Sequence, residues 1–514
     1  MKTDRILYTL SLTVFSYGLS SPYAEAADKR PNIILFIVDD MGWQDTSVPF
    51  WNQVTPLNRR YHTPNMERLA SKGVTFTSAY ASPISSPSRC SLLTGANAAR
   101  HRVTNWTFDR NVTTDVPDDA LVPPAWNLNG ITQVPGVENT FLATSFVELL
   151  RRSGYHTIHC GKAHWGAKDT PGESPMHFGF EVNIAGHAGG GPATYLSERN
   201  YGHNADGEAF SPFAVPDLRA YWQSSTFLTE ALTREAITAL QKAKSYGQPF
   251  FLNMAHYAVH IPIEKDLRFY DHYLERGLSE REAAYASLVE GMDKSLGDIM
   301  SWLERNGLEK ETVILFVSDN GGYATGKEWR DEPLFTQNAP LRSGKGSLYE
   351  GGIRVPMIAY WPGVSTEGKR CDIPVMIEDF FPSILEMAGV SVPDLPQTVD
   401  GVSFVPLIKG WLVSERERSI IWNYPNVWGN TGPGISLKCA IRKGRWKLIF
   451  DYKTGEKELY DLSTDISENR NLASKHPEIV RSLSSELGRL LRNRGAQRPF
   501  FKATGEPVPW PDET

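Results

Sequence analysis

Short apolar runs of strand length alternate along the chain with longer segments that have helical periodicity. The clearest runs are at residues 32–38, 155–160, 249–254 and 313–317. Residues 282–304 instead carry an apolar side chain at every third or fourth position, which predicts a long amphipathic helix, and residues 63–72 and 145–152 predict two shorter ones. Buried strands that alternate with helices predict an α/β fold, in which a large mixed, mostly parallel sheet is sandwiched by helices.

The pattern changes towards the C-terminus. Beyond a stretch rich in proline and polar residues (390–401), the chain has three short apolar runs and then one helical segment. They cover residues 420–421, 438–441, 446–451 and 477–494. This order predicts a smaller α+β subdomain built on an antiparallel sheet. We therefore expect a large N-terminal domain over residues 27–401 and a C-terminal subdomain over residues 402–514.

The first 26 residues have the pattern of a secretory signal peptide. A basic start with Lys2 and Arg5 precedes an apolar run that is too short to span a bilayer, and residues 24–26 (AEA) form a small-x-small cleavage site. No later segment is apolar over a membrane-spanning length, so we expect an exported protein without membrane insertion. The formal net charge is −6 and the basic residues are scattered, so we expect no nucleic-acid partner.

The chain has four cysteines, at positions 90, 160, 371 and 439. Their spacing matches no zinc pattern. In an exported protein Cys371 and Cys439 could form a disulfide, although isolated buried thiols explain the sequence equally well.

Polar side chains follow three of the predicted strands at the point where each strand ends. They are Asp39 and Asp40, His256 and His260, and Asp319 and Asn320. Each pair alone is typical of a solvated loop, but in a parallel sheet the carboxyl ends of strands lie at one edge, where ligands bind. The three carboxylates and the amide together supply hard oxygen ligands, which favour Ca²⁺ or Mg²⁺.

Residues 85–95 (SSPSRCSLLTG) predict the start of a helix, where free N–H groups and a partial positive charge favour an anion. Arg89 lies on the same helical face as Ser85 and can hydrogen-bond an activated group there. The segment resembles the maturation signature of the sulfatases, whose first residue, Cys or Ser, is oxidised to formylglycine. A start at Cys90 fails because the signature's Pro and Arg do not follow it, so Ser85 is the residue that fits.

Three further segments resemble elements of the same family. They are residues 154–166 (GYHTIHCGKAHWG), 255–262 (AHYAVHIP) and 338–356 (NAPLRSGKGSLYEGGIRVP). The positions that match functional residues of the family are Lys162, His164, His260 and Lys345. Glu350 and Arg354 are expected to hold their loop, and His256 is expected to be a structural hydrogen-bonding partner.

Together these segments span nearly the whole expected mature chain, which resembles the formylglycine-dependent type I sulfatases of the alkaline-phosphatase-like superfamily. The resemblance implies that fold and a sulfuric ester hydrolase. Its catalytic positions are Ser85, Arg89, Lys162, His164, His260 and Lys345. Its metal positions are Asp39, Asp40, Ser85, Asp319 and Asn320, which would hold one Ca²⁺, with Mg²⁺ as the alternative.

The resemblance also implies a mechanism and a maturation partner. A hydrated formylglycine made from Ser85 would attack sulfur and release sulfate by returning to the aldehyde, while two lysines neutralise the ester. His260 would be the general acid and His164 the base, although the two roles could be exchanged. A serine at position 85 resembles bacterial enzymes that are matured by a radical enzyme without oxygen, which implies a periplasmic or secreted bacterial protein.

Two long insertions between the motifs, at residues 100–137 and 167–228, are rich in aromatic and polar groups and suit a sugar. We expect a sulfated glycan as substrate, with galactose or N-acetylgalactosamine sulfate preferred, and His101, Trp106 and His187 as its contacts. The alternative is that half of these aromatic residues only pack against other parts of the protein and do not contact a sugar.

Two alternatives stay open from the sequence. One is a phosphoryl or phosphonate ester hydrolase of the same superfamily, which would hold two zinc ions through additional histidines. The other is a glycan-binding homologue in which Ser85 is never oxidised.

Overall fold

The computed structural model of the chain describes residues 30–323, 338–411, 418–429 and 434–514. The chain divides into two units, Met1–Arg30 and Pro31–Thr514, and all helices and strands given below belong to the second. The predicted signal peptide, residues 1–26, lies outside the described residues. None of the described helices is both long and apolar enough to cross a membrane.

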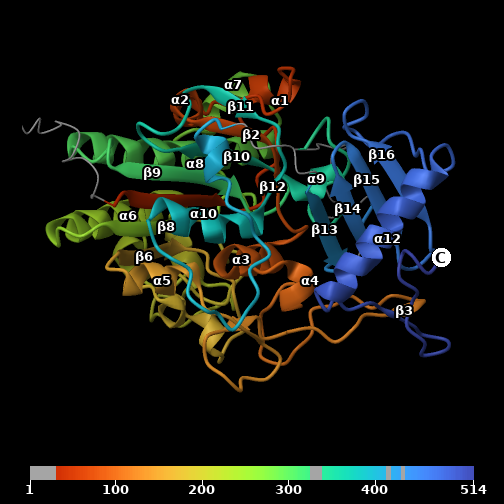
Figure 1. Cartoon of the computed structure of the whole chain (residues 1–514). Coiled ribbons are helices and arrows are strands. Elements are labelled where there is room, and N and C mark those ends of the chain that lie inside the picture. Colours follow the sequence, from red (N-terminus) through yellow and green to blue (C-terminus); the bar gives the residue numbers. More distant parts are fainter. Residues whose placement is uncertain (1–29, 324–337, 412–417, 430–433) are drawn as a thin grey trace, which may run out of the picture. The chain divides into compact units, whose positions relative to one another are not determined.

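A nine-stranded sheet forms the centre of the second unit (Figure 1). In spatial order its strands are β11 (Lys369–Cys371), β2 (Val74–Tyr80), β10 (Arg354–Tyr360), β9 (Thr312–Ser318), β1 (Asn32–Val38), β8 (Phe250–Ala255), β6 (His156–Gly161) and β7 (Val182–Ile184), with β12 (Val375–Met376) paired to β2. β10 is antiparallel to both of its neighbours, and the other pairings are parallel. The predicted mixed, mostly parallel sheet is therefore confirmed.

Helices cover both faces of this sheet (Figure 1). They are α2 (Pro64–Lys72), α3 (Ser85–Thr94), α5 (Phe146–Arg152), α6 (Leu228–Ser245), α8 (Glu280–Arg305) and α10 (Phe380–Met387). Ile34 and Phe36 of β1 belong to one apolar core with α2, α6 and α8. Ile33 and Leu35 belong to a second core with α3, α5 and α10. Because successive side chains of a strand point to opposite faces, β1 is buried on both sides, which explains its continuous apolar sequence.

The strand directions bring the chemically active segments to one edge of the sheet. β9, β1, β8 and β6 run parallel, and β2 has the same direction because the antiparallel β10 separates it from β9. The segments that follow these five strands therefore start at the same edge. β10 runs in the opposite direction, so the segment that precedes it also lies there. For this reason the segment before β10, which carries Lys345, lies at the same edge as the other predicted site residues.

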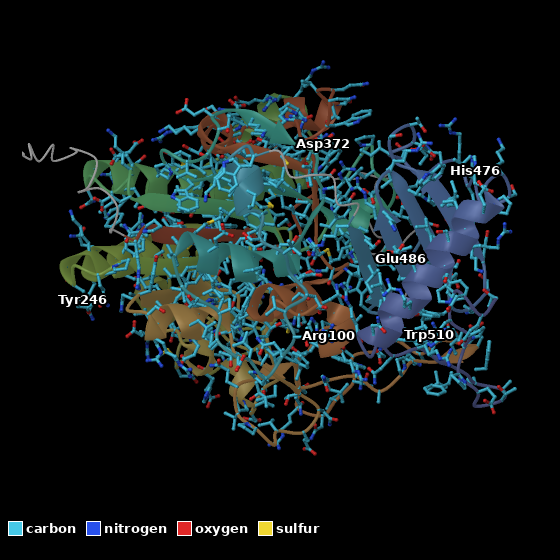
Figure 2. The ribbon with its side chains drawn as sticks, in the orientation of Figure 1. Arg100, Tyr246, Asp372, His476, Glu486 and Trp510 are labelled. Carbon is cyan, nitrogen blue, oxygen red and sulfur yellow. The ribbon has the colours of Figure 1, made fainter. Side chains whose placement is uncertain are left out.

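A separate four-stranded antiparallel sheet lies towards the C-terminus. It consists of β13 (Ser419–Tyr424), β14 (Lys438–Lys443), β15 (Trp446–Asp451) and β16 (Lys457–Asp461), and α12 (Pro477–Asn493) packs on it. Glu486 of α12, labelled in Figure 2, accepts hydrogen bonds from Ser419 and Lys443 of this sheet. The predicted antiparallel sheet and its helix are confirmed, whereas β16 was not predicted as a strand.

The remaining α-helices and β-strands are short. They are α1 (Pro56–Arg60), α4 (Ala98–His101), α7 (Tyr270–Glu275), α9 (Glu350–Ile353), α11 (Val405–Ile408), β3 (Leu121–Val122), β4 (Ile131–Thr132), β5 (Phe141–Leu142) and β17 (Phe500–Phe501).

All four cysteines are buried and free. Cys371 lies on β11 of the main sheet and Cys439 on β14 of the C-terminal sheet, so the disulfide considered between them is absent. Burial raises the pKa of the Cys439 thiol to about 12, which makes it unreactive.

A buried ion network ties the C-terminal sheet to the loop before β10. Lys447 of β15 lies 2.9 Å from a carboxylate oxygen of Glu350 and 2.8 Å from one of Glu468, and its side chain is completely buried. Glu350 also accepts from Tyr80 and Arg354, and the second oxygen of Glu468 accepts from the Glu350 backbone N–H. The predicted role of Glu350 and Arg354 in holding this loop agrees with these contacts.

We expect Lys447→Met to lower the free energy of unfolding by about 3–5 kcal/mol, because it leaves the buried Glu468 without its cation and leaves Glu350 with Arg354 alone. Lys443→Met is the matched control, since Lys443 pairs with Glu486 at a partly exposed site and should contribute about 0–1 kcal/mol. Urea denaturation of both variants measures the difference. If both variants lose the same free energy of unfolding, the buried network contributes no more to stability than the partly exposed ion pair.

Candidate active site

Ser85 lies where four strands and one helix meet. It is the first residue of α3, which begins after the extended Ile84, and its side chain is buried. Its Oγ is 3.1 Å from Lys162 Nζ, 3.1 Å from Asn320 Oδ1 and 3.3 Å from Asp39 Oδ1. Residues separated by more than 200 positions in the chain thus surround one hydroxyl group.

Three buried carboxylates around Ser85 are each paired with a cation. Asp39 Oδ2 lies 2.7 Å from Lys162 Nζ, Asp40 Oδ1 lies 2.7 Å from Lys345 Nζ, and Asp319 Oδ2 lies 2.8 Å from Arg89 Nε. Asn320 completes the group by donating from Nδ2 to Asp40 at 2.7 Å. The predicted metal positions and both predicted lysines are therefore brought together.

Arg89 contacts one of the carboxylates near Ser85. Its guanidinium donates to Asp319 and to the Lys162 carbonyl oxygen, 2.9 Å away, and not to Ser85. The carboxylate is the stronger acceptor, because the hydrogen bond to it is charge-assisted on both sides. Arg89 therefore holds the oxygen cluster in position, while its Nη2 is buried without a partner among the described residues.

Burial and neighbouring charges act in opposite directions on these groups. Burial raises the pKa of Asp39 to about 7, and Lys162 only partly offsets this effect. Burial would also raise the pKa of Asp319, but Arg89 and Lys162 lower it below its usual range. Burial lowers the pKa of Lys162. Burial acts in the same direction on Lys345, but Asp40 together with Asp39 and Asp319 raises the pKa of that lysine. Asp39 therefore resists ionisation whereas Asp319 stays charged, and a divalent ion bound here would favour the charged form of Asp39.

The donor atoms fit one hard cation. Asp39, Asp40, Asp319 and Asn320 provide carboxylate and amide oxygens, the ligand type of Ca²⁺ and Mg²⁺. Among the described residues, the one group of acids, histidines and cysteines close enough to hold a metal is Asp39, Asp40 and His260. A single histidine at the margin of this group does not provide the ligands of a two-zinc site.

Both predicted histidines lie at the site and are neutral. His164 Nε2 lies 3.1 Å from the Thr107 carbonyl oxygen, which can only accept, so Nε2 carries the hydrogen and Nδ1 is left as a bare acceptor. Burial and Lys162 hold the pKa of His164 well below its usual value. His260 donates from Nδ1 to the Ile261 carbonyl oxygen and directs Nε2 towards Asp40, 3.7 Å away. Burial and Lys345 lower the pKa of His260 to about 3.

Two residues of the site have a left-handed backbone. Asp40 has a φ of 60° and His164 a φ of 59°, a region that residues other than glycine adopt rarely. Such backbone strain clusters at functional sites, where the surrounding structure holds it in place. At both positions the chain leaves a strand and turns back over the edge of the sheet.

A pocket of about 430 Å³ opens above Ser85. Its lining includes Ser85, His164, His260, Lys345, the glycine-containing segment 190–193, and the aromatic side chains of Trp106, Phe213, Tyr323 and Trp428. Trp106, predicted as a substrate contact, therefore lies at the pocket. Phe213 and Tyr323 were not predicted, because an aromatic residue in a loop carries no local signal of the direction in which it points.

The two histidines predicted as substrate contacts do not line this pocket. His101 is fully buried behind α3, where its Nε2 lies 2.9 Å from Ser91 Oγ and its Nδ1 accepts from the Val103 backbone. His187 lies behind the glycine-rich segment, where its Nδ1 accepts from the backbone N–H of Gly189. Both imidazoles find polar partners inside the protein. His256, which was expected to be a structural hydrogen-bonding partner, lies 2.8 Å from Ser295 Oγ.

Consecutive glycines form the wall behind the active-site histidines. A Cβ atom at Gly190 would lie 2.6 Å from His164 Cε1, and one at Gly191 would lie 2.7 Å from His260 Nδ1. No side chain fits at these distances, so both imidazoles pack directly on the backbone. The sequence shows a glycine-rich stretch here but not what it touches.

A buried hydroxyl beside Lys162 and a cluster of oxygen ligands, in a pocket that Lys345 and two neutral histidines also line, is a site for hydrolysis of an anionic ester. A family model described as Sulfatase matches residues 31–390, and one described as N-sulphoglucosamine sulphohydrolase, C-terminal, matches residues 344–493. The chain belongs to the sulfatase family and is a sulfuric ester hydrolase.

Relatives resemble the chain over almost its whole length. A sulfatase of Formosa agariphila is 28% identical, and the match covers 99% of this chain and 98% of the relative. The N-acetylgalactosamine-6-sulfatase of Mus musculus is also 28% identical, with 93% and 90% covered. The crystal structure of Ps i-CgsB superposes with a TM-score of 0.72 at 27% identity and covers 91% of this chain and 94% of its own. The same protein has been solved with k-i-k-neocarrahexaose.

We expect Gly190→Ala and Gly191→Ala each to lower kcat/KM for a small aryl sulfate by about tenfold or more, because the new methyl group displaces a histidine that must be positioned within an ångström. The effect should be larger at Gly190, since His164 is enclosed whereas the side chain of His260 is 17% exposed. Gly429→Ala is the control, because a Cβ there meets no described atom within 4 Å. Unchanged kcat/KM values in Gly190→Ala and Gly191→Ala would contradict the proposal that the two histidines pack directly on this backbone.

Proposed function

We propose that the protein releases sulfate from a sulfated carbohydrate through a formylglycine made from Ser85. The observation that carries this proposal is the position of Ser85 Oγ, within hydrogen-bonding distance of Lys162 and of two oxygen ligands. A nucleophile at that atom would reach sulfur inside a shell of positive charge, which is what attack on an anion requires.

Each residue of the site would then have its own role in catalysis. Lys162 and Lys345 neutralise the sulfate oxygens, an effect that grows in the transition state. The formylglycine hydrate supplies one hydroxyl that attacks sulfur and a second whose ionisation returns the aldehyde and expels sulfate. His164 accepts a proton through its bare Nδ1. His260 gives a proton to the leaving alcohol, and the bound sulfate raises its pKa by its negative charge.

We propose Ca²⁺, with Mg²⁺ as the alternative, as the ion held by Asp39, Asp40, Asp319, Asn320 and the modified residue 85. When bound, the ion would add positive charge next to the sulfate and so favour attack on it. The oxygen donors around Ser85 support this choice over zinc.

The substrate class is proposed from the pocket and from the relatives. Trp106, Phe213 and Trp428 line the pocket above Ser85 and suit the apolar face of a sugar ring. One relative acts, by its name, on N-acetylgalactosamine 6-sulfate, and another has been solved with a carrageenan-type oligosaccharide. We propose a galactose or N-acetylgalactosamine sulfate in a host or algal glycan.

Maturation and location follow from the serine at position 85. We propose that a radical enzyme that works without oxygen removes two hydrogens from the Ser85 side chain. We further propose that the chain is exported to the bacterial periplasm or secreted, after cleavage of residues 1–26.

Two alternatives compete with this proposal. A phosphoryl or phosphonate ester hydrolase of the same superfamily would need a two-zinc site, and the single histidine beside Asp39 and Asp40 argues against it. A glycan-binding homologue would keep an unmodified Ser85.

Oxidation of Ser85 is testable directly. We expect the peptide that contains Ser85, from protein co-expressed with the maturing enzyme, to lack two hydrogens in its intact mass. We expect Ser85→Ala to abolish turnover, because alanine provides no nucleophile, while the melting temperature changes little. An unmodified Ser85 in fully active protein would contradict the formylglycine proposal.

The identity of the metal is a separate prediction. We expect one calcium per chain by elemental analysis, loss of sulfate release after treatment with EDTA, and a higher melting temperature when Ca²⁺ is returned, because an ion that binds the folded state stabilises it. Two zinc ions per chain would instead favour the phosphoryl hydrolase.

A further inference from the structure

A second and larger hollow adjoins the pocket above Ser85. Its volume is about 780 Å³, compared with about 430 Å³ for the pocket. Both are lined by Ile261, Pro262 and Tyr323, so these three residues form the boundary between them. Ile261 and Pro262 directly follow His260, and the boundary therefore lies beside the group proposed to face the leaving alcohol.

Three parts of the fold form most of the second hollow. They are the segment 259–267 after β8, the start of α7 and the first turns of α8. Its floor is apolar and aromatic, and it includes Val259, Ile263, Leu267, Tyr270, Ala284 and Tyr285. Leu267 is 66% exposed and extends this apolar lining to the surface.

The rim of the second hollow is polar and carries both signs of charge. Its charged residues are Glu198, Glu264, Lys265, Glu280 and Arg281. Lys265 lies over the ring of Tyr270 at 5.0 Å, and neither Lys265 nor Arg281 forms an ion pair with a described residue. An aromatic and apolar floor with hydrogen-bonding groups at its edge is the arrangement that binds pyranose rings, whose faces are apolar and whose edges carry hydroxyls.

We propose that the second hollow binds the sugar units next to the one that carries the scissile sulfate, so that the natural substrate is a chain of sugars and not a free monosaccharide sulfate. The inference rests on the proposed function. Continuity with the pocket across Ile261, Pro262 and Tyr323 selects this occupant, because a sugar chain that leaves the pocket past His260 enters the second hollow directly.

The first test compares chain lengths. Matured protein is supplied with N-acetylgalactosamine 6-sulfate, with galactose 6-sulfate, and with size-fractionated oligosaccharides of chondroitin sulfate and κ-carrageenan, and released sulfate is measured. We expect kcat/KM to rise at least tenfold from a monosaccharide to a tetrasaccharide of the accepted glycan. Equal values would overturn the inference. Release from an aryl sulfate but from no carbohydrate would contradict the proposed substrate class itself, and the inference with it.

The second test alters the hollow without touching the pocket. Ala284→Trp fills the hollow from α8, and Leu267→Glu places a negative charge at an exposed position where misfolding is not expected. In both variants the ratio of tetrasaccharide to monosaccharide kcat/KM should fall towards one. Leu142→Trp, at an exposed leucine that lines neither space, should keep the wild-type ratio. An undiminished ratio in Leu267→Glu and Ala284→Trp would overturn the inference, as would a preference for alkyl-chain aryl sulfates over sugar chains.

Discussion

The structure depends on the burial of six charges in one place. Three carboxylates and three cations meet at one edge of the sheet, and each carboxylate has its own partner. The pairs are Asp39 with Lys162, Asp40 with Lys345 and Asp319 with Arg89. Removing a charge from water is costly, and an unpaired buried charge is strongly destabilising, so none of these segments can move without its neighbour. The three ion pairs therefore hold the segments of the site together.

This requirement explains why distant parts of the chain are tied together. Lys345 reaches Asp40 only if the loop before β10 is held against the sheet edge, and Glu350 in that loop is bound by Lys447 of the C-terminal sheet. The C-terminal sheet thus supports the site although it provides none of the charged residues around Ser85. The neutral histidines are held differently, by close contact with the backbone of Gly190 and Gly191. Charge pairing and steric contact together leave one open side, which faces the aromatic pocket and the hollow beyond it.

Much of the fold and of the charged site was predictable, because both depend on regular patterns. The apolar runs predicted β1, β6, β8 and β9 within a residue or two, and their polar ends predicted Asp39, Asp40, Asp319 and Asn320. The substrate contacts were predicted less well. Of three residues proposed from the insertions, only Trp106 lines the pocket, since loop residues have no periodicity that indicates their direction. The contact of Arg89 with Asp319 was not predicted, because a helical face does not reveal which acceptors surround a guanidinium.

The sequence by itself determined that strands alternate with helices, that polar groups end the strands, and that Ser85 begins a helix within a sulfatase-like motif. These features depend on residues that are close together in the chain, so the order and spacing of the residues indicate them directly. Only the tertiary structure decided that β10 runs backwards and carries Lys345 to the site, that His101 and His187 face inwards, that Cys371 and Cys439 stay apart, and that a second hollow adjoins the pocket. Each of these depends on contacts between segments far apart in sequence, whose formation is governed by packing and charge pairing in three dimensions.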